Sequence, residues 1–381
     1  MSFDNSSTHL KKLFKSFLFL SKRNWWLAVF FWLVMILPAQ AVELRVAIKK
    51  NVAQLKVGSS TSAVVRNGAG EKIGELTPMA ALEAEPQGNG INLEQLGSVE
   101  IIVEPTNNGY IWIGDRWYRG RTRLVRQGNG ITAINYVNLE QYLYSVVGAE
   151  AVASWPIEAL KAQAVAARSY ALYKRSTARN GLYDLDTTIS TQVYKGLDSE
   201  YLTTHKAVNT TQGQIMTYGG QVILAAFHAS SGGHTENVED IWTSPLPYLR
   251  GVVDYDQQSP VFQWTKVFSP DEISTRLGTV GRIKSMIPEQ TTPHGRVVTM
   301  KVIGDRGITT VTGAELRKVL DLRSTLFRVT SDGNNIQVYG RGFGHGLGLS
   351  QWGAYSLAKQ GIQYQQILGH YYQQATLSRF N

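Results

Sequence analysis

The chain contains no cysteine among its 381 residues. A disulfide bond, a thiolate nucleophile and a zinc site built on cysteine are therefore excluded. Acidic residues are outnumbered, because 29 Asp and Glu face 38 Lys and Arg and leave a formal charge of +9. A mildly basic surface suits an anionic partner. The cations form no dense stripe with interleaved aromatic residues, so we do not expect a nucleic-acid partner.

Long apolar runs are also scarce, and the one that stands out lies near the N-terminus. Five cations within residues 11–23 precede an apolar run over residues 25–37, and the sequence PAQA follows at 38–41. This order predicts a secretory signal peptide over residues 1–41. An uncleaved N-terminal anchor is the alternative, although a run of 13 residues is short for a membrane span. Either way, we expect the rest of the chain to be exported.

Apolar and polar residues alternate from residue 42 to about residue 137, with Asn-Gly turn signals between the runs. This pattern indicates strands. Two helices are expected next. Asn138 and Gln141 have the spacing of a capping box, and Gly148 is expected to end the first helix. Pro156 is expected to begin the second helix, which is rich in alanine and continues to Ala178.

The later chain returns to strand-like patterns. We expect a hairpin from residues 214–217 and 222–227, strands at 297–303 and 335–339, and two closing helices near 350–360 and 364–372. The mixture predicts an α+β fold in which the long Ala-rich helix packs on antiparallel β structure.

Glu150 is the first candidate for chemistry, because it lies in the almost wholly apolar stretch 147–153. Burial among apolar groups raises the pKa of a carboxyl group and keeps it protonated, which is the state that a general acid needs. An exposed junction residue, or a structural partner of Arg168, is the alternative. Arg168 lies four residues after Ala164 on the small-residue face of the long helix, where a guanidinium needs an acidic or carbonyl partner.

Residues 228–236 form the second candidate segment. They combine His228, His234, two serines and a glutamate around a Gly-Gly pair. Small residues let a ligand approach backbone N–H groups, so we favour a substrate-binding loop. A metal shared by the two histidines is a second possibility, although the spacing matches no standard zinc site. A polar hairpin loop is the third.

Residues 340–354 form the third segment, with glycine at every second position up to Gly348. The alternation predicts a strand with one bare face, approached by a ligand or by a packed helix. His345 could be a base, a hydrogen-bond donor or a core residue. The segment is neither a phosphate-binding loop nor a dinucleotide fingerprint, and Ser350 lies in no nucleophile elbow.

Taken together, these segments resemble the stage II sporulation protein D / LytB family of peptidoglycan-acting proteins. The resemblance rests on residues 142–150, 155–170 and 191–194, the Ser231-Gly232-Gly233 loop, residues 247–249, and residues 344–354. It covers about residues 95–375 and implies a catalytic domain there. The domain would follow a small β-rich region over residues 42–94 and precede a C-terminal tail over residues 376–381.

The resemblance implies lytic transglycosylase activity on peptide-free glycan strands, in the periplasm or cell wall. It places the family's catalytic glutamate on Glu150, which would act as acid and then as base, without water, and leave 1,6-anhydro-N-acetylmuramic acid ends. The expected substrate-binding residues are Gln163, Arg168, His228, Ser231, His234, His345, Ser350 and Gln351. Contact with the membrane is expected only through the N-terminal segment.

The resemblance leaves two further possibilities. Some family members bind zinc through histidine and cysteine near the Gly-Gly loop. Without cysteine we expect no metal, and His228 and His234 are the only weak candidates. The chain could also be a peptidoglycan-binding modulator that enhances an amidase, as is described for LytB-type relatives. An unrelated metal-dependent wall hydrolase using His228, His234 and His345 is a further alternative.

Overall fold

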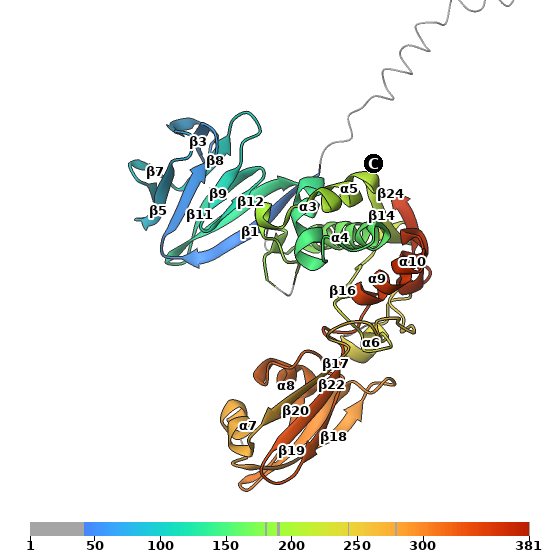
Figure 1. Cartoon of the computed structure of the whole chain (residues 1–381). Helices are drawn as coiled ribbons and strands as arrows, with labels where there is room; N and C mark the ends of the chain where they lie inside the picture. Colours follow the sequence, from blue (N-terminus) through green and yellow to red (C-terminus); the bar gives the residue numbers. More distant parts are fainter. Residues whose placement is uncertain (1–41, 180, 189–190, 243, 279, 381) are drawn as a thin grey trace, which may run out of the picture. The chain divides into compact units, whose positions relative to one another are not determined.

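The structure is a computed structural model that describes residues 42–179, 181–188, 191–242, 244–278 and 280–380. The predicted export segment, residues 1–41, lies outside these ranges. Within them, no helix is both long enough and apolar enough to cross a membrane. Residues Glu43–Phe380 cluster as one compact unit. The expected α+β class is confirmed, because the chain combines helices with several sheets whose strands pair mostly antiparallel (Figure 1).

The N-terminal part of this unit is built from two sheets. A seven-stranded sheet has the order β13-β1-β12-β11-β8-β3-β4, and a six-stranded sheet has the order β10-β9-β2-β5-β6-β7. The strands are β1 (Glu43–Val52), β2 (Leu55–Ser59), β3 (Ala63–Asn67), β4 (Lys72–Leu76), β5 (Ala81–Gln87), β6 (Gly90–Leu93), β7 (Leu96–Ser98), β8 (Glu100–Pro105), β9 (Ile111–Ile113), β10 (Arg116–Tyr118), β11 (Arg121–Gln127), β12 (Gly130–Asn138) and β13 (Leu185–Asp186). The sheets contact each other, and their facing apolar residues, such as Val57, Ile101 and Leu124, are fully buried.

The predicted boundary at residue 94 does not separate these strands. It falls in the turn between β6 and β7, which pair with each other, and β1 pairs with β12 from beyond the boundary. The sequence showed the turns between strands, but strand pairing over such separations depends on tertiary contacts. The region before residue 95 therefore shares its sheets with the region after it.

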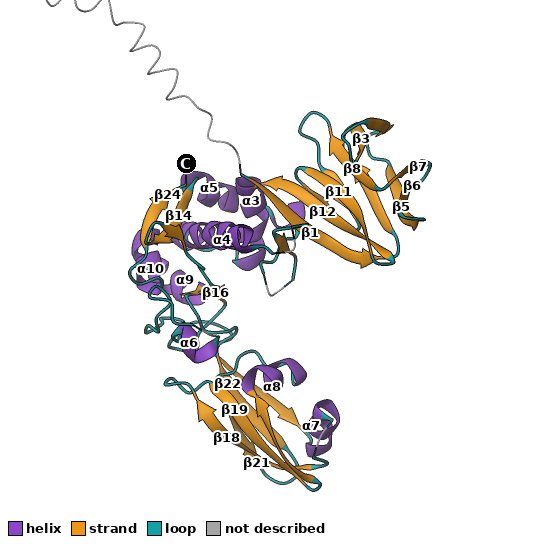
Figure 2. Cartoon of the chain, turned by 180° about the vertical axis from the view of Figure 1, so that it is seen from behind, coloured by secondary structure: helices purple, strands orange, loops and turns teal. Residues whose placement is uncertain are grey.

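Helices follow the sheets and gather around one central helix. α4 (Ile157–Thr177) contacts α3 (Leu139–Glu150), α5 (Leu202–Thr210), α9 (Gln351–Lys359) and α10 (Tyr364–Tyr371), all purple in Figure 2. Its alanines are buried, which lets these neighbours approach closely. α4 also contacts β14 (Gln214–Tyr218). The long helix therefore packs on helices as well as on the antiparallel structure that was expected.

β14 lies in a small sheet with β15 (Gln221–Val222) and β24 (Thr376–Arg379). Residues 376–379 therefore form an edge strand, which corrects the predicted C-terminal tail. The cause is pairing over a long sequence separation, Gln214 to Arg379, which no local pattern announces. The short η1 (Gly196–Ser199) and α6 (Val238–Ile241) complete this part.

The ends of α3 show what local signals captured. Asn138 caps the helix, and its side-chain oxygen accepts from the N–H groups of Glu140 and Gln141 at 2.8 and 3.3 Å. The helix does not end at Gly148, as predicted, but continues to Glu150. A Cβ on Gly148 would lie 2.0 Å from the carbonyl oxygen of Ser199. Glycine is therefore used there for close packing rather than for a helix stop.

Residues 263–341, called the insert here, have a hydrophobic core of their own. The insert lies between β16 (Phe227–His228) and β23 (Leu349–Ser350), which pair in parallel. It holds two three-stranded sheets, β17-β22-β21 and β18-β19-β20, with α7 and α8 beside them (Figure 1). The bounds are β17 (Gln263–Phe268), α7 (Pro270–Leu277), β18 (Ile283–Thr291), β19 (Val297–Gly304), β20 (Gly307–Thr312), α8 (Gly313–Val319), β21 (Phe327–Ser331) and β22 (Ile336–Arg341). The core includes Trp264, Met300 and Val338.

The Gly-rich segment after the insert is not a strand. Gly342, Gly344, Gly346 and Gly348 all have positive φ, so the chain turns at every second residue instead of extending. The expected close approach is present, but it comes from the protein itself. A Cβ on Gly344 would lie 2.6 Å from the Cβ of His228, and one on Gly346 would lie 2.4 Å from the guanidinium of Arg296.

Substituting Gly346 should therefore be costly. Gly346→Ala is expected to lower the free energy of unfolding by more than the about 1–3 kcal/mol of backbone strain alone, because the new methyl also displaces Arg296. Gly333→Ala is the matched control, since Gly333 has a similar φ of 88° but no atom within 4 Å of the new Cβ. Denaturant unfolding of the two variants measures the difference. Equal losses would mean that the close approach to Arg296 contributes nothing.

Candidate active site

Glu150 is the last residue of α3, and its carboxyl group is held by two segments that are distant in sequence. One side-chain oxygen accepts the backbone N–H of Val193 at 2.7 Å. The other lies 3.5 Å from the side-chain amide nitrogen of Gln351, the first residue of α9. The side chain is partly buried. Glu150 and Gln351, both predicted as site residues, are thus brought together.

Gln192 fixes the position of the Val193 N–H. Its side chain is fully buried, accepts the hydroxyl of Tyr142 on α3 at 3.1 Å and donates to the carbonyl of Ala167 on α4 at 3.2 Å. This bridge holds residues 191–194 against both helices. In the sequence this segment is recognisable only as part of the family pattern, which predicts no separate role for it. A backbone donor has no side-chain signature, so the TQVY motif was the only available signal.

The environment of Glu150 favours the protonated acid. Burial raises the pKa of its carboxyl group above the usual range, while the Val193 N–H, Gln351 and the charge of Lys195 oppose the shift. Its place at the carboxyl end of α3 also disfavours negative charge, because the helix carries partial negative charge there. These groups leave the acid neutral more often than an exposed glutamate, yet provide hydrogen bonds for the carboxylate once it forms.

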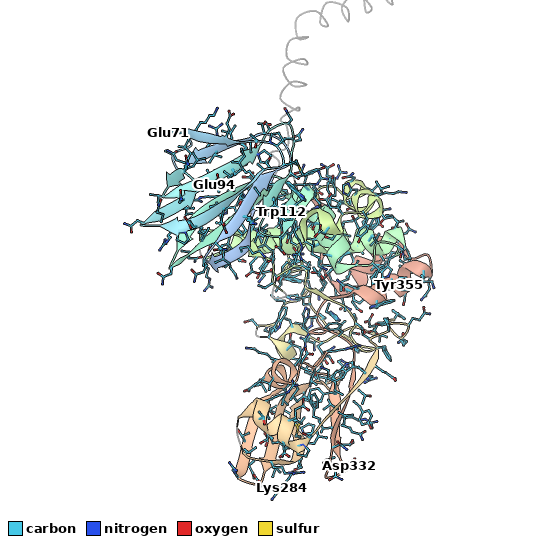
Figure 3. The ribbon with its side chains drawn as sticks, turned by 60° about the vertical axis from the view of Figure 1, so that its left-hand side comes forward. Glu71, Glu94, Trp112, Lys284, Asp332 and Tyr355 are labelled. Atoms are coloured by element: carbon cyan, nitrogen blue, oxygen red, sulfur yellow. The ribbon has the colours of Figure 1, made fainter. Side chains whose placement is uncertain are left out.

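Three aromatic rings lie beside this pair in the chain. Trp155 follows α3, Trp352 directly follows Gln351 on α9, and Tyr355 lies one turn later on the same helix; Figure 3 labels Tyr355. The Trp155 ring is 4.9 Å from that of Trp352 and 5.1 Å from that of Tyr355, and all three side chains are partly exposed. Exposed aromatic faces next to a polar group offer a stacking surface for a sugar ring.

Arg168, which was predicted both to need an acidic or carbonyl partner and to bind substrate, has a structural role. Its side chain has no exposed surface, and its guanidinium binds both carboxylate oxygens of Glu140 at 2.6 and 2.9 Å. It also donates to the carbonyl of Gln214 at 3.1 Å. The expected acidic and carbonyl partners are therefore present, but the partner is Glu140 and not Glu150. Because the guanidinium is enclosed, its predicted contact with substrate is not available in this structure.

Three other predicted binding residues are also enclosed. Gln163 is 2% exposed, and Ser231 and Ser350 are fully buried. The Ser231 hydroxyl donates to Asp254, while Ser350 caps α9 by accepting the N–H of Gly353 at 3.2 Å. The amide of Gln163 has no hydrogen-bond partner within the described part of the chain. Ser231 therefore stabilises its loop and Ser350 the start of α9, and none of the three presents a surface to a ligand.

The three histidines predicted for binding do not come together. The rings of His228 and His345 lie 5.2 Å apart, and Trp242 covers His345 at 5.1 Å. His234 instead stacks on His294 at 3.5 Å. Burial lowers the pKa of His345 to about 3, and it also lowers the pKa of His228, which favours the neutral form of both rings.

A zinc site does not fit this arrangement. Its two candidates, His228 and His234, lie against different histidines, His345 and His294. Among the residues that the structure describes, no group of three or more His, Asp or Glu side chains could hold a metal ion. His228 is instead linked to the Glu150 site by strand pairing. It pairs with Ser350, and the next residue, Gln351, contacts Glu150.

Comparison with known proteins matches two regions of the chain. A family model described as stage II sporulation protein matches residues 127–218, which include Glu150 and Val193. A model described as a domain of unknown function, DUF8618, matches residues 249–348, which include the insert.

Several curated proteins are similar over most of the chain. Stage II sporulation protein D of Bacillus subtilis is 36% identical over 266 residues, covering 65% of this chain and 76% of that protein. An uncharacterised protein of Brachyspira hyodysenteriae is 33% identical over 301 residues, covering 77% of this chain and 80% of that protein. The amidase enhancer of Bacillus subtilis is 30% identical over 293 residues, covering 62% of this chain and 40% of that protein.

Proposed function

Because the chain belongs to the stage II sporulation protein D family and has a role connected with the cell wall, we propose that it is an exported lytic transglycosylase acting on peptide-free glycan strands. The observation that carries the proposal is the carboxyl group of Glu150. It is partly buried, its pKa is raised, and it is fixed by Val193 and Gln351. These are the properties of a general acid.

In the first step, Glu150 donates its proton to the glycosidic oxygen that leaves N-acetylmuramic acid. The bond from C1 to that oxygen breaks, and the departing sugar keeps the proton. The carboxylate that remains is stabilised by the Val193 N–H and the Gln351 amide, at 2.7 and 3.5 Å. The positive charge that develops at C1 in this step is also favoured by the nearby carboxylate.

In the second step, the same carboxylate removes the proton from the 6-hydroxyl of the muramic acid. The 6-oxygen attacks C1, a 1,6-anhydro ring closes, and Glu150 is protonated again. No water is consumed, so the two-carboxylate arrangement of ordinary glycoside hydrolysis is not required. Trp155, Trp352 and Tyr355 supply stacking faces for neighbouring sugars of the strand.

The proposal is tested by digesting purified peptide-free strands with the chain and analysing the ends by mass spectrometry. Ends that lack one water relative to a reducing sugar support it. Reducing ends alone would indicate a hydrolase, and inhibition by a chelator would favour a metal-dependent one. Likeness to the amidase enhancer supports a second candidate, a non-catalytic modulator. In that case the strands stay intact, but the chain accelerates a separately added amidase.

The pH dependence of the reaction should follow the Glu150 carboxyl group. The free enzyme needs the protonated acid, so kcat/KM is expected to fall as pH rises through the pKa, which burial has raised. Gln351 stabilises the carboxylate and thus lowers this pKa. Gln351→Ala should therefore shift the falling limb of the kcat/KM profile to higher pH. A limb that stays in place would show that Gln351 does not act on Glu150.

A further inference from the structure

The insert presents one polar sheet face. In the register of β17, β22 and β21, Gln263 lies opposite Arg341, and Tyr339 lies between Thr265 and Arg328. Opposite residues of antiparallel strands share a face, and this face alternates with the buried one that carries Trp264, Val338 and Phe327. The cationic face, as it is called here, consists of Gln263, Thr265, Val267, Arg328, Thr330, Gln337, Tyr339 and Arg341.

The charge of this face is positive and not neutralised. Arg328 and Arg341 are exposed and make no ion pair within the described residues; Arg328 lies 5.1 Å from the ring of Tyr339. The three strands contain no acidic residue. Their third cation, Lys266, is paired with Asp321 at 3.0 Å. Two guanidinium groups without an ion pair, one of them beside an aromatic ring, are suited together with the amide side chains to an anionic ligand with polar hydroxyl groups.

A cavity of about 500 Å3 opens at the Arg341 end of the face. Its lining includes Gln263, Thr265, His294, Arg328, Tyr339 and Arg341, and no carboxylate. This end contacts the Gly-Gly loop: a Cβ on Gly232 would lie 2.9 Å from the Cβ of Arg341. The buried Arg296, which belongs to the insert, also holds this loop by donating to the carbonyl of Ser231 at 2.7 Å.

We propose that the cationic face binds the carboxylates of a peptide-free glycan strand. When the stem peptide is removed, each muramic acid is left with a free lactyl carboxylate, which is otherwise tied up in an amide bond. A repeating carboxylate on a sugar chain matches two exposed guanidinium groups, a tyrosine ring and the amides of Gln263 and Gln337. The face therefore selects strands without peptides. This inference rests on the proposed function for its choice of ligand.

Binding to purified peptide-free strands tests the inference in the full chain carrying Glu150→Gln, so that no cleavage occurs. Adding Arg328→Gln and Arg341→Gln is expected to weaken binding about tenfold at low salt, since two exposed charge contacts are lost. Reducing the carboxylates of the strands to alcohols should weaken their binding to the chain that keeps both arginines. This binding should then be as weak as that of natural strands to the double variant. The salt dependence should shrink in both cases.

The matched control removes the same charge elsewhere on the insert. Lys284 on β18, labelled in Figure 3, and Arg306 in the turn before β20 are exposed and make no ion pair in the part of the chain that is described. Lys284→Gln with Arg306→Gln should leave binding within about twofold.

Three outcomes would overturn the inference: no binding at all, unchanged binding by the arginine variant, or equal weakening by the control. If the wild-type chain binds the strands but releases no anhydro ends from them, only the proposed function is contradicted.

Discussion

Glu150→Gln is expected to abolish the release of 1,6-anhydro ends from peptide-free glycan strands. Positioned acid–base catalysis contributes about 100- to 10,000-fold, and here one residue supplies both proton transfers. Glutamine keeps the shape of the side chain and can still accept the Val193 N–H, but it has no acidic proton to transfer to the glycosidic oxygen. The product ends, quantified by mass spectrometry over a time course, measure the loss.

The stability of the Glu150→Gln chain shows whether a loss of activity comes from lost catalysis or from lost folding. A pKa that is raised in the folded state means that the ionised carboxylate weakens folding as pH rises above the unfolded pKa. Glu150→Gln should thus be at least as stable as wild type at neutral pH, and the difference should vanish in acid. Glu83→Gln, at an exposed position on β5, is the control and should keep full activity. An active Glu150→Gln chain would rule out the proposed mechanism.

Arg168→Met is expected to lower the free energy of unfolding by about 3–5 kcal/mol, because it leaves Glu140 without its buried partner. The pair also joins the helices to the start of β14, through the Gln214 carbonyl and the N–H of the preceding Gly213. Chemical denaturation followed by circular dichroism measures the loss. The folded molecules that remain at low temperature should keep a normal KM for glycan strands.

The double variant Glu140→Gln with Arg168→Met provides the matched comparison. It removes both charges and should recover part of the lost stability, since no unpaired carboxylate stays in the interior. An Arg168→Met chain that is as stable as wild type but has a raised KM would contradict this structural role. It would support the direct binding role that the sequence predicted for Arg168.

Local signals predicted several elements well. The Asn138 cap, the start of α4 after Pro156, and the closing helices α9 and α10 all lie within a residue or two of their expected positions. In each case the deciding interactions join residues a few positions apart, such as a side-chain cap or an apolar stripe. Such interactions can be read from neighbouring residues without knowledge of the fold.

Glycine was the residue most often misinterpreted. Gly148 was expected to end a helix, and the alternating glycines before Gly348 were expected to form a strand. The first expectation used the conformational freedom of glycine. The second used the missing side chain but not the positive φ angles at which these glycines turn the chain. The reason for these glycines is a distant atom, the Ser199 carbonyl in one case and the side chains of His228 and Arg296 in the other. The sequence does not show which atom occupies the space that the missing side chain of a glycine leaves open.

By itself, the sequence determined the family, the α+β class and the choice of Glu150 as the candidate acid, because these depend on residue types in contiguous motifs. Only the tertiary structure decided which groups surround that acid. In the structure Glu150 contacts Val193 and Gln351, and Arg168 forms its ion pair with Glu140. His228 and His234 lie against different histidines. The physical reason is that burial, hydrogen bonding and pKa depend on atoms within a few ångströms, and those atoms come from segments up to two hundred residues away in the chain.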